Sequence, residues 1–414
     1  MPVIRAVLVL LVSTFLMMGG LGSMGTLLSL RLDQAAASPL AIGVVMAAYF
    51  AGLTVGALHV ASVIGRVGHI RAFSAFMSLM SAAALGHALK LDPVLWAALR
   101  LLEGYCMAGL FVCVESWLNH TAPTAVRGRV LAFYMISLYG GQGVGQWLLG
   151  LDRGGFVVFV LASMLFSVAL VPVALTRQTP PTLPRIVALG FRRLYAASPL
   201  GIMGTVTSGL VTGAIYSLGP VTVRHLGYGA AEAGLFMSAA ILGGMILQWP
   251  LGRLSDVLDR RRVLVGLYGG LSAVSLALLA APAAGFAGLL LGAAALGGAA
   301  FAVYPTSVAH TNDRLAADEA VAASGGLVLG YSLGAVAGPL GAAALITAAG
   351  GIGLFLFTAL VGAAAAGFGW WRMQVSPPVP QEEQAPFVPL PRTTPLATGM
   401  AEAAGRGDGA AGGP

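Results

Sequence analysis

The sequence predicts an all-α integral membrane protein with twelve transmembrane helices in two pseudo-symmetric six-helix halves. Two observations predict membrane insertion: 58% of the 414 residues are hydrophobic, and only 9% are charged, whereas a soluble domain carries about 25% charged residues. A third observation, the recurrence of similar segments in both parts of the chain, predicts the two halves. This composition excludes soluble enzymes, nucleic-acid-binding proteins and disordered scaffolds.

Apolar runs of membrane-spanning length recur along the whole chain, because a spanning helix needs about 20 such residues. Six lie in the first half: Ala6–Leu30, Leu40–Ile64, Ala72–Leu89, Pro93–Leu118, Val130–Gly150 and Gly155–Leu175. Six lie in the second half: Leu200–Val223, Ala233–Leu251, Val263–Ala281, Phe286–Ala309, Val321–Ala348 and Ile352–Trp371. Turn residues at Ala281–Gly285 and Ala349–Gly351 divide the two longest uncharged stretches. Apolar and polar residues do not alternate in these runs, so we expect helices and not a β-barrel.

The spans divide the chain into two halves, residues 1–175 and 200–371. The connection 176–199 contains four prolines and four arginines and is the expected cytoplasmic central loop. Residues 372–414 are rich in Pro, Gly and Ala and show no apolar periodicity. We therefore predict that this last segment is a disordered cytoplasmic tail.

The placement of the basic residues predicts the orientation of the bundle. Seventeen of the 22 Lys and Arg residues fall on the side of the N-terminus, Arg100 lies inside a span, and four face the other side: Arg31, Lys90, Arg153 and Arg224. The positive-inside rule then places both termini in the cytoplasm, in a multi-pass protein of the cell's inner (cytoplasmic) membrane. The net charge of +7 is a topology signal, and no nucleic-acid partner is expected.

Neither a cofactor nor a metal is expected. Cys106 and Cys113 share one face of an apolar helix, without metal-ligand spacing. The sequence has no Gly-x-x-x-x-Gly-Lys motif for ATP. The spans contain no pairing of a nucleophile with a base, so we expect that the protein is not an enzyme.

Two pairs of similar segments make the internal repeat. Ala61–Arg71, between spans two and three, is similar to Gly252–Arg262, between spans eight and nine. The glycine pair Gly141 and Gly145 of span five has its counterpart in Gly334, Gly338 and the adjoining Pro339 of span eleven. Glycines four residues apart permit close helix contact, and we expect these faces to let the halves rock and Pro339 to add a kink. Two related halves predict a transporter with its site at the midplane between them.

The repeated loops resemble the major facilitator superfamily. Gly252, Asp256, Arg260 and Arg261 match its short-loop signature, Gly-x-Leu-x-Asp-x-x-x-Arg-Arg, and Arg100–Gly104 matches its fourth-span signature. Four strings are similar to the YcaD-like branch: Val114–Ser116, Arg127–Ala132, Gln248–Arg253 and Val303–Pro305. The resemblance implies a cytoplasmic clasp, built by Gly252, Asp256, Arg260 and Arg261, that favours an outward-open state.

The sequence departs from this pattern in two places. The first loop copy has Ala61 in place of the first glycine and Gly65 in place of the aspartate. Span one, Ala6–Leu30, has no acidic residue, so a mechanism that protonates a first-span carboxylate is not expected.

Arg100 and Glu103 are the main candidates for substrate binding and proton coupling. Charges inside a span are costly, and the i,i+3 spacing allows the two side chains to pair. They form either a structural ion pair or a site in which Arg100 binds an anionic group or modulates protonation of Glu103. Gln142 and Gln146 share one helix face and either bind substrate or bridge helices, and Tyr331 is a further pocket candidate.

Glu115 is expected near the cytoplasmic end of span four, as part of a gate or a structural pair. Its candidate partners are Arg66, Arg127 and Arg129, and Arg71 belongs to the same basic group.

Taken together, these residues predict a secondary active transporter that moves a small solute by alternating access. We expect proton coupling, a lipid bilayer as its environment and a monomeric state. Two alternatives remain: a lipid or amphiphile translocator of the same fold, and a membrane sensor or assembly partner that does not transport.

Overall fold

The computed structural model describes residues 2–123, 126–152, 155–176, 181, 189–316 and 319–400, with the backbone alone for residues 2–6 and 281–284. Twelve long helices make up most of this part of the chain. The first half contains α1 (Pro2–Gln34), α2 (Pro39–Val67), α3 (His69–Leu89), α4 (Pro93–Thr121), α5 (Arg127–Gly145) and α6 (Val157–Ala174). The second half contains α8 (Pro199–His225), α9 (Ala230–Val257), α10 (Arg260–Leu278), α11 (Ala281–Asn312), α12 (Ala320–Ala349) and α13 (Gly353–Val375).

The short elements lie at the ends of the long helices. The helix α7 (Phe191–Ala197) belongs to the central loop, whose residues 177–180 and 182–188 lie outside the described ranges. Short 3₁₀ helices follow α5 at Gln146–Leu151, join α12 to α13 at Gly350–Ile352, and lie in the C-terminal segment at Gln381–Glu383. Eleven of the twelve long helices fall in stretches long and apolar enough to cross a membrane. The exception is α5, which begins with two arginines.

Local sequence signals explain where several helices begin and end. Ser38, Asp92 and Ser198 each accept hydrogen bonds from the first backbone amides of α2, α4 and α8, and each is followed by proline. A polar N-cap followed by proline is a strong helix start. Gly350, with φ of +69°, ends α12. The predicted division of the longest apolar stretches is therefore confirmed.

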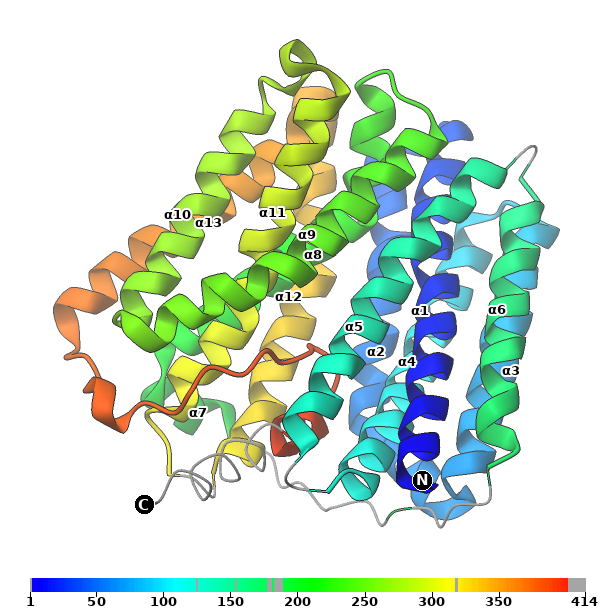
Figure 1. The fold of residues 1–414 in the computed structure, drawn as a ribbon. Helices are drawn as coiled ribbons and strands as arrows, with labels where there is room; N and C mark the ends of the chain where they lie inside the picture. The colour runs from blue at the N-terminus through cyan, green and yellow to red at the C-terminus, as the bar shows by residue number, and fades with distance from the viewer. Residues whose placement is uncertain are drawn as a thin grey trace.

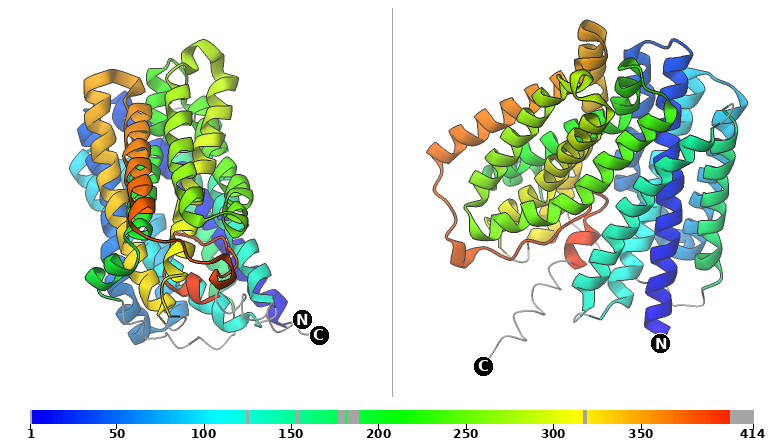
Figure 2. Two further views of the ribbon diagram at one scale, coloured as in Figure 1. Left: turned by 90° about the vertical axis from the view of Figure 1, so that its left-hand side faces the viewer. Right: turned by 45° about the horizontal axis from the view of Figure 1, so that its top comes forward.

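The two halves lie side by side and have the same internal arrangement (Figures 1 and 2). In the first half α1 packs on α5, α2 on α4 and α3 on α6. The equivalent pairs of the second half are α8 with α12, α9 with α11, and α10 with α13. The halves meet where α2 packs on α12 and where α5 packs on α9. The internal repeat relates these two contacts to each other.

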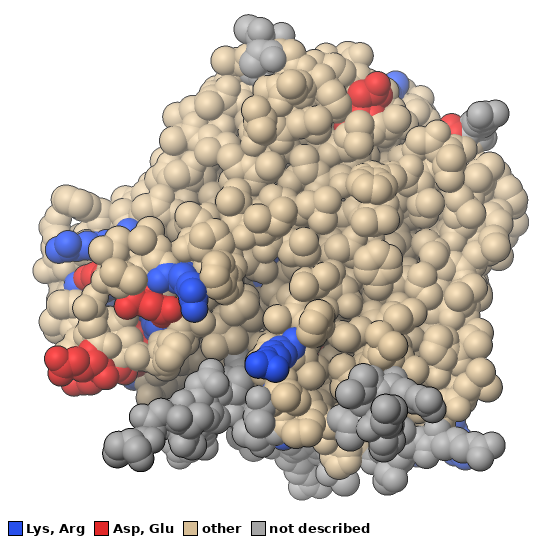
Figure 3. Space-filling model, viewed as in Figure 1, with Lys and Arg blue, Asp and Glu red and all other residues tan. Residues whose placement is uncertain are grey.

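The bundle has two ends, which we call the N-terminal face and the opposite face. The N-terminal face is where the N-terminus, α7 and residues 376–400 lie, at the bottom of Figure 1. The opposite face holds the end of α1 at Gln34. On the side seen in Figure 3, a broad band without charged side chains separates charges near the top from charges along the lower part. Such a band suits contact with the apolar part of a membrane.

Candidate functional site

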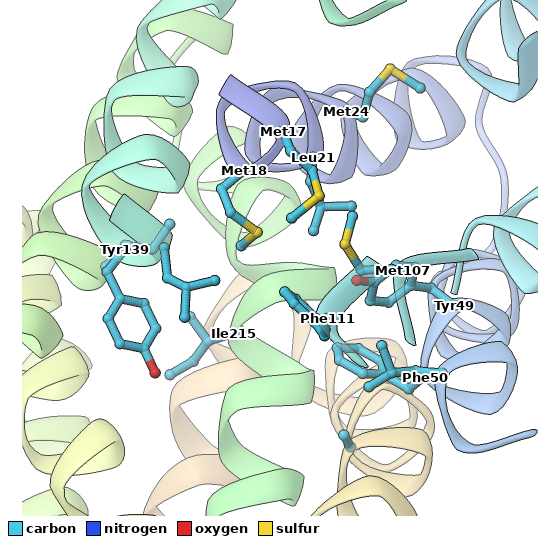
Figure 4. Packing of buried hydrophobic residues seen from close by; sticks show 14 of the residues in the cluster. Met17, Met18, Leu21, Met24, Tyr49, Phe50, Met107, Phe111, Tyr139 and Ile215 are labelled. Carbon is cyan, nitrogen blue, oxygen red and sulfur yellow. The ribbon is translucent and has the colours of Figure 1, made fainter. Parts of the chain in front are cut away.

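A cavity of about 120 Å³ lies between the two halves. Helices α1, α2, α4 and α5 line it from one side, and α8, α9 and α12 from the other. Most of its wall is apolar or aromatic. Figure 4 shows six of the side chains that line it: Met18, Leu21, Tyr49, Phe50, Phe111 and Tyr139.

Arg100 and Glu103 form the predicted ion pair, in which Arg100 Nη1 donates to Glu103 Oε2 at 2.8 Å. Both side chains are buried, and Arg100 lines the cavity. The Arg100 guanidinium carbon lies 4.3 Å from the centre of the Tyr49 ring, so a cation–π contact supports the pair. Glu103 Oε1 lies 3.5 Å from His87 Nδ1. The result is a buried Arg–Glu–His cluster with its arginine at the cavity wall.

The two glutamines of span five have different partners. Gln146 bridges helices: Thr26 donates to its Oε1 at 2.7 Å, and its Nε2 donates to the Gly22 carbonyl at 2.9 Å. Gln142 connects the halves, because its Oε1 accepts a hydrogen bond from the Tyr216 hydroxyl at 3.2 Å. Both line the cavity. Tyr331 also lines it, and its hydroxyl accepts from a threonine of α8.

Residues 376–400 of the C-terminal segment are packed into the molecule, which contradicts the predicted disordered tail 372–414 for the part that the structure describes. Residues 376–400 leave α13, cross the N-terminal face and end between α5 and α12 (Figures 1 and 2). Phe387, Leu390, Arg392 and Met400 are buried. The prediction failed because the segment has no apolar face of its own, and its partners lie in both halves. Residues 401–414 lie outside the described ranges.

Arg392 enters the cavity and is 7% exposed. Its guanidinium carbon lies 4.0 Å from the centre of the Phe301 ring and 5.7 Å from those of Tyr139 and Tyr331. Its Nη2 donates to the Tyr139 hydroxyl at 3.3 Å. Tyr139 belongs to the first half, and the other two rings belong to the second. We call these three rings the aromatic cage.

Glu115 is fully buried and bonds to hydroxyl groups. The Tyr134 hydroxyl donates to its Oε1 at 2.8 Å, and the hydroxyls of Thr393 and Thr394 donate to its two oxygens. The carboxylate of α4 thus anchors the C-terminal segment beside the cage.

The expected pairing of Glu115 with arginines is wrong. None of the ion pairs in the described part of the chain joins it to Arg66, Arg127 or Arg129. Arg66, Arg71 and Arg129 are exposed, and Arg127 Nε donates to the Ala122 carbonyl at 3.0 Å. These side chains lie at helix ends on the N-terminal face, whereas Glu115 lies deeper in α4.

The signature loop of the second half also binds the C-terminal segment. Asp256 Oδ1 accepts from the Phe387 amide at 2.7 Å and from Arg260 Nη2 at 3.4 Å. Arg260 also donates to the Ala385 carbonyl, while Gly252 leaves room for the Phe387 ring, which a Cβ would displace. Among the described residues, this loop therefore binds the C-terminal segment and its own half. It does not form the expected clasp onto the first half.

Two further ion pairs complete this loop. Arg260 Nη1 donates to both oxygens of Asp313 at 2.6 Å, at the end of α11. Arg261 Nη2 pairs with Asp259 at 2.7 Å. Burial raises the pKa of Asp313 above its ordinary value, and the Arg260 guanidinium opposes that rise.

At the opposite face the halves meet directly. Asp33, at the end of α1, pairs with Arg224 and, at 3.0 Å, with His225 Nε2, both at the end of α8. A second pair at this face, Arg31 with Asp152 at 2.6 Å, stays within the first half. Sequence reasoning did not single out Asp33. Its separation from Arg224 is 191 residues, the same as the offset between the two loop copies. Asp33 and Arg224 therefore occupy equivalent positions in the repeat, and this equivalence could have identified them.

The glycine pairs pack inside each half. Gly141 and Gly145 lie against the backbone of α1, and Gly334 and Gly338 lie against the backbone of α8, with no room for a Cβ at any of them. The expected close helix contact is therefore present, but these faces lie inside each half and not at the boundary where rocking of the halves would occur. Pro339 does lie between the halves, where its carbonyl packs on Gly43 of α2.

Sequence reasoning also missed His87 and Arg392. His87 is close to the end of α3, whereas Glu103 is eleven residues into α4. Counting residues from the connecting loop does not place them together. Arg392 lies in a segment without apolar periodicity. Only the tertiary structure brings the three rings of the aromatic cage around it.

Comparison with known proteins agrees with this architecture. The family model described as Major Facilitator Superfamily matches residues 10–203 and 200–401. The chain is 31% identical to an "Uncharacterized MFS-type transporter" of Yersinia pestis (strain Pestoides F) over 350 residues, which are 81% of this chain and 87% of the relative. It is 30% identical to the "Uncharacterized MFS-type transporter YcaD" of Salmonella enteritidis PT4 over 347 residues, 83% and 89% of the two chains.

Two solved structures have the same fold. One is a variant of the nucleoside transporter NupG, with a TM-score of 0.74, 13% identity and coverage of 89% of this chain and 100% of that one. The other is a bacterial homologue of the human lysosomal transporter Spinster in an inward-facing and occupied conformation, with a TM-score of 0.69, 15% identity and coverage of 91% and 97%. The chain belongs to the Major Facilitator Superfamily and is a multi-pass membrane transporter.

Proposed function

We propose that this protein is a secondary active transporter that moves a small solute by alternating access. The observation that carries the proposal is the position of the cavity, between two halves related by an internal repeat. A site at such an interface is exposed to one side at a time when the halves rock about it. One chain contains both halves and the whole described cavity wall, which suits a monomer.

The charges support an orientation for this proposal. Under the positive-inside rule, the basic loops of the N-terminal face favour the cytoplasmic side of the cell's inner membrane for that face. The opposite face, closed by Asp33 with Arg224 and His225, is then the outer face. In this orientation, the described conformation corresponds to a state closed to the outside.

A cysteine reporter in the cavity tests alternating access. Gly25 lines the cavity, and a Cβ at this position meets nothing within 4 Å. We would introduce Gly25→Cys after replacing the buried Cys106 and Cys113 by alanine. The rate at which a membrane-impermeant thiol reagent labels it from outside then reports opening of the outer face.

Asp33→Asn should raise the external labelling rate about fivefold, because it removes the partly exposed ion pair with Arg224, worth about 1 kcal/mol, and weakens the contact with His225. The matched control is Asp152→Asn, which breaks the pair with Arg31 at the same face but within one half. Equal labelling rates in the two variants would contradict alternating access at this closure.

We also propose that Glu103 is the proton-coupling carboxylate. Its Oε2 is held by Arg100, while its Oε1 has no hydrogen-bond donor in the described part of the chain and faces His87. The free oxygen of this buried carboxylate is a place for a proton, and the neighbouring imidazole, whose Nδ1 donates to the Ala83 carbonyl at 2.8 Å, is a second titratable group beside it.

The pH dependence of Gly25→Cys labelling tests this coupling without a known substrate. If Glu103 takes up the proton that shifts the conformation, the labelling rate should depend on pH in the parent protein and lose that dependence in Glu103→Gln. Glu319→Gln, at a surface pair with Arg193, is the control and should keep the dependence. A pH response that survives Glu103→Gln would assign coupling to another group.

A further inference from the structure

We infer that the aromatic cage of Tyr139, Phe301 and Tyr331 is a subsite for a small organic cation, a guanidinium or amine compound, and that Arg392 occupies it as a tethered competitor. The inference rests on the proposed function, because it takes the central cavity as the substrate site. It adds the chemical class of the ligand and a role for the C-terminal segment.

The geometry of the cage suits a cation. An electron-rich ring face attracts a guanidinium or ammonium group within about 6 Å of the ring centre, and the Arg392 guanidinium carbon meets that condition with all three rings. Rings from both halves surround the same charge. A cation in this position therefore contacts elements that move relative to each other when the halves rock.

The charges beside the cage favour a cation over an anion. Arg100 and Glu103 neutralise each other. The remaining charges are the Arg392 guanidinium and the Glu115 carboxylate, which the adjoining Thr393 and Thr394 bind. When the segment leaves, Glu115 keeps the hydroxyl of Tyr134 but loses those of Thr393 and Thr394. A buried carboxylate that has lost hydrogen bonds and has no counter-charge is costly, and an incoming cation offsets that cost.

The position of the segment explains why Arg392 acts as a competitor and not as a fixed wall. It is connected to α13 by residues 376–391, and on this path the signature loop holds Ala385 and Phe387. The segment lies outside the twelve long helices, so it can leave without unfolding them. A ligand held on a short tether has a millimolar effective concentration at its site, and a free cation has to compete with that concentration.

Three isosteric probes test the inference: benzamidinium, which is cationic, benzamide, which is neutral, and benzoate, which is anionic. Binding to the purified full chain in nanodiscs is measured by calorimetry for the parent protein and for Arg392→Gln. Benzamidinium should bind Arg392→Gln about tenfold more tightly or better, because the tethered cation is gone. Benzamide and benzoate should show no gain.

Two further variants make the test specific. Arg253→Gln is the control, because Arg253 stacks on Trp249 at 4.5 Å on an exposed helix face outside the cavity, and it should bind benzamidinium as the parent does. Phe301→Leu, added to Arg392→Gln, should lower benzamidinium affinity about tenfold through loss of the nearest ring. The thermal unfolding midpoint of each variant shows that it is folded.

Two results would overturn the inference: no gain of benzamidinium affinity in folded Arg392→Gln, or benzoate binding that depends on Arg392. The second result would make Arg392 an anion-binding group. If Asp33→Asn still opens the outer face to the reporter at Gly25, either result removes the cation subsite but leaves alternating access in place. If the reporter never responds while benzamidinium gains affinity, the subsite stands and the transport mechanism fails.

Discussion

The two ends of the bundle are closed in different ways. At the opposite face, the ends of α1 and α8 meet directly, and Asp33 of one half pairs with Arg224 and His225 of the other. At the N-terminal face, none of the ion pairs among the described residues joins the halves, and the C-terminal segment lies between them. In the proposed mechanism the first closure opens when the halves rotate, whereas the second requires a segment to leave.

The two copies of the repeated loop show the origin of this asymmetry. The copy in the second half has Gly252, Asp256 and Arg260, and all three contact the segment. The copy in the first half has Ala61 and Gly65 at the positions of the glycine and the aspartate. One closure arises from pseudo-symmetric helix ends, and the other arises from a single complete loop and an added segment.

The largest effect is expected from removing the segment. Truncation after Pro386 deletes Phe387, Arg392 and the two threonines that bind Glu115. Labelling of Gly25→Cys from the cytoplasmic side, measured in inverted vesicles, should rise about tenfold or more, because the closed population loses most of its contacts. Truncation after Met400 retains every described contact and should leave the rate unchanged. Equal rates in the two truncations would show that the segment does not close this face.

A tenfold rise in the rate of amide hydrogen exchange is expected from Glu115→Gln. The carboxylate accepts three hydroxyl hydrogen bonds, and a hydrogen bond to a charged group contributes about 1.5–3 kcal/mol. Amide hydrogen exchange in residues 387–400 should become about tenfold faster, as expected for local release of the segment. Glu382→Gln removes the same charge at an exposed position of the segment and should have no effect. Unchanged exchange in Glu115→Gln would mean that the anchor lies elsewhere.

A smaller effect is expected from Gly252→Ala. The added methyl group displaces the Phe387 ring, and overpacking of this kind costs about 1 kcal/mol or more. Exchange in residues 385–390 should rise about fivefold. Gly266→Ala on α10, where a Cβ meets nothing within 4 Å, is the control. If both variants behave as the parent does, the ring is not seated against α9.

The smallest effect is expected from Asp256→Asn. The asparagine oxygen can still accept from the Phe387 amide, and Arg260 keeps its pair with Asp313. Loss of the charge at a partly exposed side chain then costs about 0.5 kcal/mol. Exchange in residues 385–390 should rise about twofold. A tenfold rise would instead show that Asp256 is the main anchor of the segment.

The sequence predicted the pair of Arg100 and Glu103, because two residues three apart on a helix are neighbours whatever the helix packs against. It predicted close contact at the glycine pairs for a similar local reason. It did not predict that these pairs face α1 and α8 inside each half, since the partner of a small-residue face is a property of the whole bundle. The different partners of Gln142 and Gln146 arose in the same way.

The sequence by itself determined the twelve helices, the two halves and the family, because apolar length, helix caps and repeated motifs are local properties of the chain. Tertiary structure alone decided the pair of Asp33 and Arg224, the approach of His87 to Glu103 and the cage around Arg392. Each of these contacts joins residues on different elements. In a chain with so few charged residues, the partner of a charge depends on which helices pack together, and periodicity does not specify that packing.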